Sequence, residues 1–434
     1  MGGFNKKTIK DISLQGKRVL LRADYNVPLV DGRVSEDYRL QASLPTIKYL
    51  LEQKVNGLII ISHLGRPDGK PDRSLSLGPV AKRLGELLGR KIQFADDCVG
   101  EVVKQAVDQL KPGDILLLEN LRFHPGEEAD DPDFAKALVE AASAEIFVQD
   151  GFGVVHRAHA STDAITKLLP SVAGLLLERE VGTLEKVMAG PARPLTAVIG
   201  GAKIADKIDV LKKFIGLADN VAVAGAMANN FLLTEGHGVG RSIIDKSSAG
   251  LTKEILALAR AAEATRPFNF IVPVDGVVST LTDGRAPTRV VDFSNSLADI
   301  ETYPKRPKPA SYTVAADELI LDIGPLSAQR IAGTVTASRT VIWNGTAGVT
   351  ETRGLSSAIG PFSHGTRVIV EAIIGTSRNH KNRPFSVVGG GDTTSYIEQQ
   401  KLLDDFNFVS TGGGASLELL AGHILSGIRA LQDK

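Results

Sequence analysis

Short apolar segments alternate with longer amphipathic segments along most of this chain of 434 residues. Apolar runs of three to five residues bounded by polar turns are typical of strands that are buried on both faces of a sheet. The segments that predict strands are Arg18–Arg22, Leu58–Ser62, Ile115–Leu118, Ile146–Gln149, Leu195–Ile199, Val221–Ala224, Leu319–Asp322, Val341–Trp343 and Ser386–Val388. The segments that predict helices are Tyr38–Leu51, Gly78–Leu88, Asp133–Ala142, Ala205–Phe214 and Leu251–Ala262. This alternation predicts an α/β fold in which helices cover both faces of a parallel sheet.

The number of predicted strands fits two sheets better than one, and the chain is long enough for two or three domains. We expect the junction at Leu168–Pro194, where a long amphipathic helix over Gly174–Met188 is flanked by prolines. The predicted parts are an N-terminal domain over residues 1–173, a connecting helix over 174–190 and a second domain that begins at 191. Residues 281–310 contain four prolines and are expected to form a surface loop.

Charge and cysteine usage narrow the class of protein. Lys and Arg together number 50, as do Asp and Glu, so the formal net charge is zero, which argues against a general binder of nucleic acid or of a membrane surface. The single cysteine, Cys98, cannot form an internal disulfide, and we interpret it as a small core residue. The polar segment Met1–Asp11 is not a secretory signal, and no run of about 18 apolar residues predicts a membrane span. A cytoplasmic location is therefore expected.

Basic side chains follow the predicted strands in the first half of the chain. Residues just after each strand are candidates for a site, because ligands of open α/β sheets bind at the carboxyl ends of the strands. The candidates are His63, Arg66, Arg122, His156 and Arg157, with Arg22 and Arg39 close by. One arginine is usually a solvated charge, but several at one sheet edge favour a site for a small anion, since a guanidinium binds phosphate or carboxylate in a bidentate manner. We expect the two histidines to hydrogen-bond the anion, because no HExxH or Cys/His motif supports a metal site there.

Glycine-rich turns follow the predicted strands in the second half. Three of them, at residues 200–207, 389–394 and 411–416, each lead from a strand into a helix. Glycine allows phosphate oxygens to approach backbone amides, and the N-terminus of a helix favours negative charge. Lys203 and Lys207 are one helical turn apart, so we expect both to face the same anion, and Asp392 is expected to hold Mg²⁺ against nucleotide phosphates. A single such turn is usually a tight connection, but three in one lobe favour a nucleotide phosphate site.

Two common nucleotide-binding signatures do not occur in the sequence. There is no G-x-x-x-x-G-K-[ST] loop, and no turn gives G-x-G-x-x-G followed by the acidic residue that binds a ribose. An NAD-dependent dehydrogenase therefore stays as a disfavoured alternative. The residues favour an enzyme that transfers a phosphoryl group between a nucleotide and a small phosphorylated acid.

Nine motifs in a fixed order resemble those of the phosphoglycerate kinase family. In chain order they are RADYNVPL, SHLGRP, ENLRFH, HRAHAST, GGAKIADKI, LDIGP, WNGTAGVTE, VVGGGDTTS and STGGGASLELL. Each motif alone is weak, but nine in order across essentially the whole chain are specific. The resemblance implies two Rossmann-like domains, a nucleotide domain over residues 191–405, and a C-terminal segment over 406–434 that returns to the N-terminal domain. It also implies a monomer.

The resemblance implies roles for individual residues. The residues that would bind 3-phosphoglycerate or 1,3-bisphosphoglycerate are Asp24, Asn26, Arg39, His63, Leu64, Gly65, Arg66, Arg122 and Arg157. Those that would bind ADP or ATP are Lys207, Glu351, Gly390, Gly391, Asp392 and Thr393, with Mg²⁺ at Asp392. The transferring phosphoryl group would be steadied by Arg39, Lys203 and the amides near Gly390 and Gly413.

Two positions depart from the usual WNGP-x-GVFE motif of the family. Thr346 stands in place of proline and Thr350 in place of phenylalanine, whereas Glu351 is retained. These threonines are the only support for a second alternative, a binding or scaffold protein without activity. The implied reaction needs no catalytic base, because a carboxylate and the β-phosphate of ADP are already anionic near neutral pH. We therefore expect positioning and cationic stabilisation by Arg39, Lys203 and Mg²⁺, with the two lobes closing about the connector.

Overall fold

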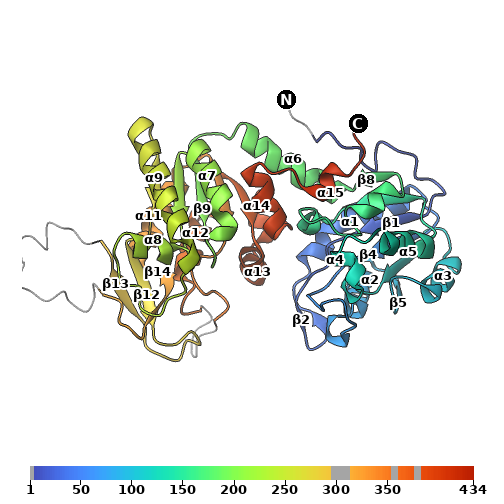
Figure 1. The fold of residues 1–434 in the computed structure, drawn as a ribbon, viewed down its shortest axis with the longest axis horizontal. Coiled ribbons are helices and arrows are strands. Elements are labelled where there is room, and N and C mark those ends of the chain that lie inside the picture. Colours follow the sequence, from blue (N-terminus) through green and yellow to red (C-terminus); the bar gives the residue numbers. More distant parts are fainter. Residues whose placement is uncertain (1–3, 295–312, 353–359, 376–382) are drawn as a thin grey trace, which may run out of the picture. The chain divides into compact units, whose positions relative to one another are not determined.

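The computed structural model describes residues 4–294, 313–352, 360–375 and 383–434, and it divides into two compact units (Figure 1). The first unit comprises Met1–Ala189 and Thr411–Lys434, and the second comprises Gly190–Ser410. The long predicted helix is α6 (Leu175–Ala189), and it ends at the last residue before the second unit. Each unit contains its own parallel sheet with helices, which confirms the predicted fold class.

The first unit is built on a six-stranded parallel sheet in the order β5-β6-β4-β1-β7-β8. Its strands are β1 (Val19–Arg22), β4 (Leu58–Ile61), β5 (Gln93–Ala95), β6 (Ile115–Leu118), β7 (Ile146–Gln149) and β8 (Ser171–Ala173). Its main helices besides α6 are α1 (Tyr38–Glu52), α2 (Gly78–Leu88), α3 (Glu101–Asp108) and α5 (Pro132–Ala142). A small hairpin of β2 (Leu29–Val30) and β3 (Arg33–Val34) follows β1. Strand β8 lies within the predicted N-terminal domain, near the predicted junction, and was not among the predicted strands, because the three residues Ser-Val-Ala are too few to indicate a strand by themselves.

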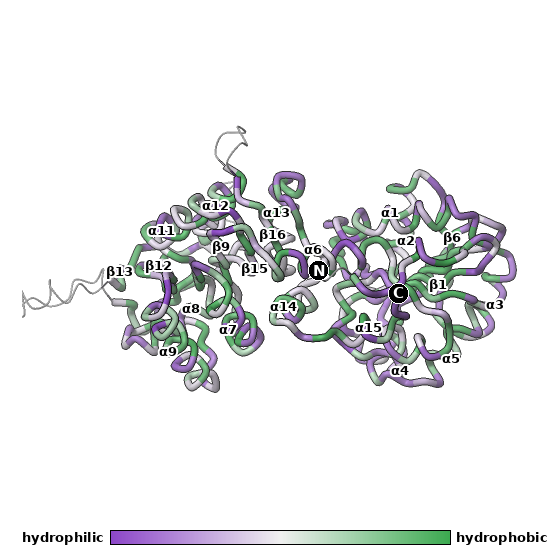
Figure 2. Tube along the Cα trace, turned by 90° about the horizontal axis from the view of Figure 1, so that it is seen from above, coloured by the Kyte–Doolittle hydropathy of each residue, from purple (hydrophilic) through white to green (hydrophobic). Residues whose placement is uncertain are grey.

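Successive residues of the first sheet bury opposite faces. Val19 and Leu21 of β1 belong to the core cluster that includes residues of α1 and α2, whereas Leu20 belongs to the cluster formed with α3 and α5. This period of two is what a strand covered on both faces requires. Figure 2 shows apolar positions gathered along β1 and its neighbours. Cys98 is fully buried in the second of these clusters, which confirms its interpretation as a core residue.

The second unit contains a six-stranded parallel sheet in the order β11-β10-β9-β15-β16-β17. Its strands are β9 (Leu195–Ile199), β10 (Asn220–Val223), β11 (Asn269–Ile271), β15 (Thr340–Asn344), β16 (Phe385–Gly389) and β17 (Phe408–Val409). Its helices are α7 (Ile208–Leu217), α8 (Ala228–Thr234), α9 (Ala249–Thr265), α11 (Pro325–Thr336), α12 (His364–Ile374) and α13 (Gly391–Gln399). The described helices include none long and apolar enough to cross a membrane.

One predicted strand belongs to a different sheet. Leu319–Asp322, expected in a βαβ unit, lies in β14 (Leu319–Ile323), which pairs antiparallel with β12 (Asp275–Ser279). On its other side β12 pairs antiparallel with β13 (Arg289–Asp292), so part of the segment 281–310 is a strand and not the expected loop. Residues 295–310 of that segment lie outside the described residues. A short apolar run indicates burial but not the direction of its partner, which explains the error.

The segment from Thr411 onward folds onto the first unit. Helix α14 (Gly413–Ala421) packs against α6, and α15 (Ser426–Arg429) follows it. Near the end of the chain, Lys7 N–H donates to Gln432 O at 2.8 Å, and Lys6 Nζ lies 2.8 Å from Asp433 Oδ1. Both ends of the chain are therefore tied to the same unit.

Candidate functional site

Polar side chains follow four strands of the first sheet at its carboxyl edge. These are Asp24 after β1, His63 after β4, Arg122 in the 3₁₀ turn η2 (Leu121–Phe123) after β6, and Arg157 after β7. Arg39, in the first turn of α1, donates from Nη1 to Asp24 Oδ2 at 2.5 Å. The predicted anion-binding residues are therefore brought to one edge, as the α/β topology requires.

A loop of backbone lies between these side chains. The Gly65 N–H donates to Asn26 Oδ1 at 2.9 Å, and Arg122 Nη1 donates to Gly65 O at 2.7 Å. Gly65 has a φ of +63°, and a Cβ on it would overlap the side chain of Leu75, so a larger residue would be strained there and would displace Leu75. Arg66, the next residue, is exposed. The loop thus links Asn26 and Arg122 and leaves the Arg66 guanidinium open to solvent.

Asn120 holds the same loop in place by hydrogen bonds to Leu64, a role that was not predicted from the sequence. Its Nδ2 donates to Leu64 O at 2.7 Å, and the Leu64 N–H donates to its Oδ1 at 3.2 Å. Asn120 is fully buried, and Oδ1 also accepts the Arg122 N–H at 3.1 Å. The signal that could have found it is an amide directly before Arg122, at the end of an apolar strand.

A buried ionic network lies beneath the anion-binding edge. Arg22 is fully buried, donates from Nε to Ser161 Oγ at 2.7 Å, and lies 3.6 Å from Glu127 Oε1. Glu127 is also fully buried and accepts hydrogen bonds from Ser161 Oγ at 2.6 Å and from Ser161 N–H at 3.1 Å. Burial raises the pKa of Glu127, and the nearby Arg22 opposes that rise. Arg22 therefore takes a supporting position below the edge, although the sequence placed it close to the ligand.

This network fixes the proton of His63. Arg22 Nη2 lies 3.3 Å from His63 Nδ1, and a guanidinium can only donate. His63 Nδ1 must then carry the lone pair, so the neutral imidazole carries its proton on Nε2. Burial and the charges of Arg22, Arg122 and Arg39 hold the pKa of His63 well below its ordinary value. His63 is therefore a neutral hydrogen-bond donor of fixed tautomer.

Two further histidines of the first unit are kept neutral in the same way. Burial, followed by Arg157, lowers the pKa of His156 to about 4, and burial, followed by Arg22, lowers that of His159 to about 3. Arg157 donates from Nε to His156 Nε2 at 3.2 Å. The field of several arginines thus disfavours any further positive charge at this edge, and an anionic ligand would find its cationic partners already in place.

The third glycine turn belongs to this unit, which corrects the expectation of three glycine turns in one lobe. Gly413 is the first residue of α14, and the neighbouring Gly414 lies close to His156, whose Nε2 would be 3.3 Å from a Cβ at that position. The start of α14 is therefore near the anion-binding edge of the first unit. The sequence indicated the turn itself but not the sheet that it adjoins.

In the second unit, two glycine turns lead from strands into helical segments, as predicted. Gly200 and Gly201 follow β9, and Gly390 precedes α13 with a φ of +99°. Lys207 is buried, donates from Nζ to Asn344 Oδ1 at 2.9 Å and also to Gly200 O. Burial lowers the pKa of Lys207 to about 8. Its ammonium therefore ties β15 to the first glycine turn.

Lys203 and Lys207 do not lie on the regular helix that was expected to carry them. The helix α7 begins only at Ile208, and Ala205–Lys207 form a 3₁₀ turn. Lys203 is exposed, whereas Lys207 points inward to carbonyl oxygens. The glycine-containing turn before these residues prevents the 3.6-residue period on which the expectation depended.

A pocket of about 440 Å³ opens beside these turns, and all of its lining residues belong to the second unit. Its polar rim includes Glu351 and Asp392, and its wall includes Gly201, Gly225, Ile320 and Thr346. A volume of this size suits a nucleoside or a similar small molecule. Thr393 lies behind the rim, fully buried, and its Oγ1 accepts the Gly345 N–H at 2.9 Å.

The three aspartates of this pocket divide into two kinds. Asp275 accepts the Ser327 N–H at 2.8 Å, and Asp322 accepts the Gly365 N–H at 2.9 Å, so each caps the start of a helix. Burial raises the pKa of Asp322 to about 7. Asp392 instead lies exposed in the first turn of α13. Of these three, Asp392 offers an accessible oxygen of the type that Mg²⁺ prefers.

Comparison with known proteins gives one family throughout. The family model for phosphoglycerate kinase matches residues 9–423. A phosphoglycerate kinase of Pelotomaculum thermopropionicum is 42% identical over 429 residues, which cover 99% of this chain and 100% of that relative. The phosphoglycerate kinase of Chloroflexus aurantiacus is 43% identical over 433 residues, with the same coverage of 99% and 100%.

Two solved structures of phosphoglycerate kinases are also similar to this chain. The phosphoglycerate kinase of Coxiella burnetii is similar with a TM-score of 0.74 and 33% sequence identity. That of Pyrococcus horikoshii is similar with a TM-score of 0.79 and 28% identity. Each comparison covers 98% of both chains.

Proposed function

This chain belongs to the phosphoglycerate kinase family, and on that premise we propose how its two units divide the reaction. The reaction is the reversible transfer of a phosphoryl group between 1,3-bisphosphoglycerate and ADP, which gives 3-phosphoglycerate and ATP. We propose that the first unit binds the phosphorylated acid and that the second binds the nucleotide. The observation that carries this proposal is the gathering of Arg39, Arg122 and His63 at one sheet edge, separate from the pocket of the second unit.

The acid would be held by cations and by neutral donors together. Its binding residues would be Asp24, Asn26, Arg39, His63, Leu64, Gly65, Arg66, Arg122 and Arg157. The guanidinium groups supply charge, and His63 supplies a proton on Nε2. Glu127 and Ser161 do not touch the acid in this proposal but position Arg22, and through it the imidazole of His63. The pairing of Arg39 with Asp24 would hold the guanidinium ready for the ligand.

The nucleotide would occupy the pocket of the second unit. Its binding residues would be Lys207, Glu351, Gly390, Gly391, Asp392 and Thr393, and Asp392 would hold Mg²⁺. When bound, Mg²⁺ neutralises part of the phosphate charge. The amides at the start of α13 face the phosphates in this proposal, and the Glu351 carboxylate at the rim of the pocket would accept a hydrogen bond from a ribose hydroxyl.

The chemical step would need no base from the protein. A β-phosphate oxygen of ADP attacks the acyl phosphorus, a new P–O bond forms, and the bond to the carboxyl oxygen breaks with that carboxylate as leaving group. Repulsion between anions is the main barrier, so Arg39, Lys203 and the amides of Gly390 and Gly413 would stabilise the phosphoryl group in flight. An acid bound in one unit and a nucleotide bound in the other must meet, so the units would close during turnover.

The test is ATP formation from 1,3-bisphosphoglycerate, measured with and without ADP and Mg²⁺. An NAD-dependent dehydrogenase or an inactive scaffold with Thr346 and Thr350 would form none. Closure is tested by small-angle scattering, in which superimposable profiles of the free and doubly liganded protein would contradict it. We also propose that the protein is a cytoplasmic monomer that binds no nucleic acid. Light scattering at several protein concentrations would test the oligomeric state.

A further inference from the structure

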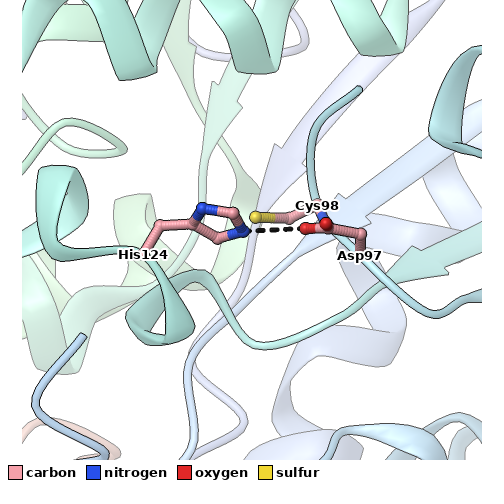
Figure 3. A group of neighbouring side chains, drawn as sticks. All are labelled: Asp97, Cys98 and His124. Atoms are coloured by element: carbon pink, nitrogen blue, oxygen red, sulfur yellow. Dashed lines mark hydrogen bonds and ion pairs between the residues drawn. The ribbon is translucent and has the colours of Figure 1, made fainter. Parts of the chain in front are cut away.

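A group of three different side chains lies outside both sites described above. Asp97 and Cys98 follow β5 and precede α3, and His124 lies between η2 and the short helix α4 (Pro125–Glu128). One ligand atom from each, a carboxylate oxygen, the sulfur and a ring nitrogen, all lie within 4.8 Å of one another. Figure 3 shows the imidazole of His124 directed toward Asp97, and its Nε2 lies 2.7 Å from Asp97 Oδ1.

We propose that Asp97, Cys98 and His124 form a site for a Zn²⁺-like divalent ion, with water as the fourth ligand. The donors are one sulfur, one nitrogen and one oxygen, a set that suits Zn²⁺ and does not suit Mg²⁺, which takes oxygen ligands. A thiolate and a carboxylate together carry two negative charges, which one divalent ion neutralises. Three protein ligands and one open position are the arrangement of zinc sites that retain a bound water.

Two of the donors are already held in position. The ring of His124 stacks on Phe134, with ring centroids 5.2 Å apart. Asp97 Oδ1 accepts the Cys98 N–H at 2.6 Å, which fixes the carboxylate beside the sulfur. The side chains of His124 and Asp97 are 31% and 41% exposed, so an ion can reach the group from solvent although Cys98 is buried. An ion would replace the hydrogen bond between His124 Nε2 and Asp97 Oδ1.

The three side chains come from two segments that are distant in the chain. An ion bound by them would join the loop after β5 to the turn after β6. It should therefore raise the unfolding temperature of the protein.

The experiment uses the full chain after treatment with a chelator, without acid or nucleotide. Zn²⁺ binding is measured by equilibrium dialysis, and Co²⁺ is used as a spectroscopic probe. We expect one Zn²⁺ per chain, a sulfur-to-cobalt charge-transfer band, and a rise in the unfolding temperature with Zn²⁺ that excess Mg²⁺ does not reproduce. Cys98→Ser should abolish the band and weaken Zn²⁺ binding by about tenfold or more.

Asp97→Asn serves as a second variant, because it keeps a hydrogen-bond acceptor and changes a partly exposed side chain. It should weaken Zn²⁺ binding while the protein remains folded. His364→Gln, which changes a histidine outside the group, should bind Zn²⁺ like the unaltered protein. Co²⁺ binding without a charge-transfer band, or equal Zn²⁺ affinity in the unaltered protein and Cys98→Ser, would overturn the proposal. None of these readouts depends on the division of the reaction proposed above.

Discussion

In the proposed division of the reaction, the two units bind their anions by different means. In the first, side-chain cations gather at the sheet edge, and one of them, Arg39, is paired with Asp24 before any ligand binds. In the second, the candidate contacts come from backbone at glycine turns and from a pocket, and the main buried cation is Lys207. Side-chain charge suits a small acid with charge at both ends, whereas backbone amides suit the phosphates of a larger ligand that also fills a pocket.

The two units also differ in the pH range over which their ionisable side chains change charge. Around the first edge, His63, His156 and His159 stay neutral far below neutral pH, so the charge of this edge should be constant under ordinary conditions. Lys207 of the second unit has a pKa of about 8 and can lose its charge within an accessible range. The two sites should therefore respond differently to pH, and this response can be measured separately through the KM of each substrate.

The largest expected effect comes from Arg39→Ala. Loss of a cation that stabilises the transferring group should lower kcat by roughly 100- to 1000-fold, as for the removal of a donor that acts in the transition state. Its side chain is 23% exposed and that of its partner Asp24 only 5%, so the free energy of unfolding should also fall, and kcat is compared at a temperature at which both proteins are folded. Steady-state kinetics and a urea titration measure both quantities.

The matched control for Arg39 is Arg83→Ala. Arg83 also pairs with carboxylates, at 2.7 Å from Asp37 and 2.8 Å from Glu86, but it is not among the proposed acid-binding residues. It should keep turnover within about twofold of the unaltered protein, as expected of an exposed ion pair of small energetic value. Equal losses in the two variants would remove the special role of Arg39, and wild-type turnover in Arg39→Ala would contradict it directly.

Lys203→Ala should have the next largest effect and tests whether the second unit also contributes a side-chain cation. Lys203 is exposed and is therefore free to approach a bound phosphoryl group, so kcat should fall by about 100-fold while the protein stays folded. Lys213→Ala, an exposed lysine on α7, provides the control. If Lys203→Ala were as active as this control, the second unit would stabilise the phosphoryl group through backbone amides alone. The first unit would then be the one that supplies side-chain charge.

A third test uses the pKa of Lys207. Above pH 8 the buried ammonium loses its proton, so the KM for ATP should rise by up to about tenfold per pH unit, while the KM for 3-phosphoglycerate should stay constant. The stability of the folded protein should increase over the same pH range in which ATP binding weakens. The unfolded chain keeps this proton up to about pH 10.5 and the folded chain only up to about 8, so the free energy of unfolding should increase with pH between these values.

Parallel measurements on Lys207→Arg separate this group from others that titrate in the same range. An arginine keeps its charge, so its KM for ATP should not rise above pH 8, provided that a thermal unfolding curve shows a folded protein. A rise of the same size in this variant would assign the titration to another group.

Much of the fold was predictable because the strands of the two main sheets are continuous apolar runs. Ile115–Leu118, Ile146–Gln149 and Leu195–Ile199 were predicted with the bounds that the structure has. The sequence could not show that β14 pairs antiparallel, because pairing direction depends on a partner distant in the chain. It also gave no sign of β8, whose three residues form a strand only because β7 lies beside them.

The candidate site was predictable where residues follow strands and unpredictable where they support others. Arg122 and His63 were found because they come directly after apolar runs. Glu127 was missed, since a glutamate in a polar segment gives no indication that tertiary packing buries it completely. The metal-ligand group was missed for a similar reason, because Cys98 and His124 are brought together only by the neighbouring strands β5 and β6.

The smallest expected effect on turnover comes from Glu127→Gln, which tests the supporting network of the first unit. Removing the charge leaves Arg22 buried without its carboxylate, which should lower the free energy of unfolding by about 3–5 kcal/mol. If the network positions His63, the KM for 3-phosphoglycerate should rise by about tenfold or less, with kcat and the KM for ATP nearly unchanged. Ser161→Ala, which removes one hydrogen bond to Glu127 and one to Arg22, offers a milder change if the first variant does not fold.

A structural readout decides between positioning and simple destabilisation. The ¹⁵N chemical shifts of the His63 ring report which nitrogen carries the proton, and in the unaltered protein they should show the proton on Nε2 at pH 6 to 8. In Glu127→Gln the ring should show a mixture of tautomers, because Arg22 is no longer held at Nδ1. A protonated or Nδ1–H imidazole in the unaltered protein would contradict the geometry on which the network depends. A single unchanged tautomer in Glu127→Gln together with a raised KM would assign the effect to charge alone, and the first unit would then prepare for its anion purely by electrostatics.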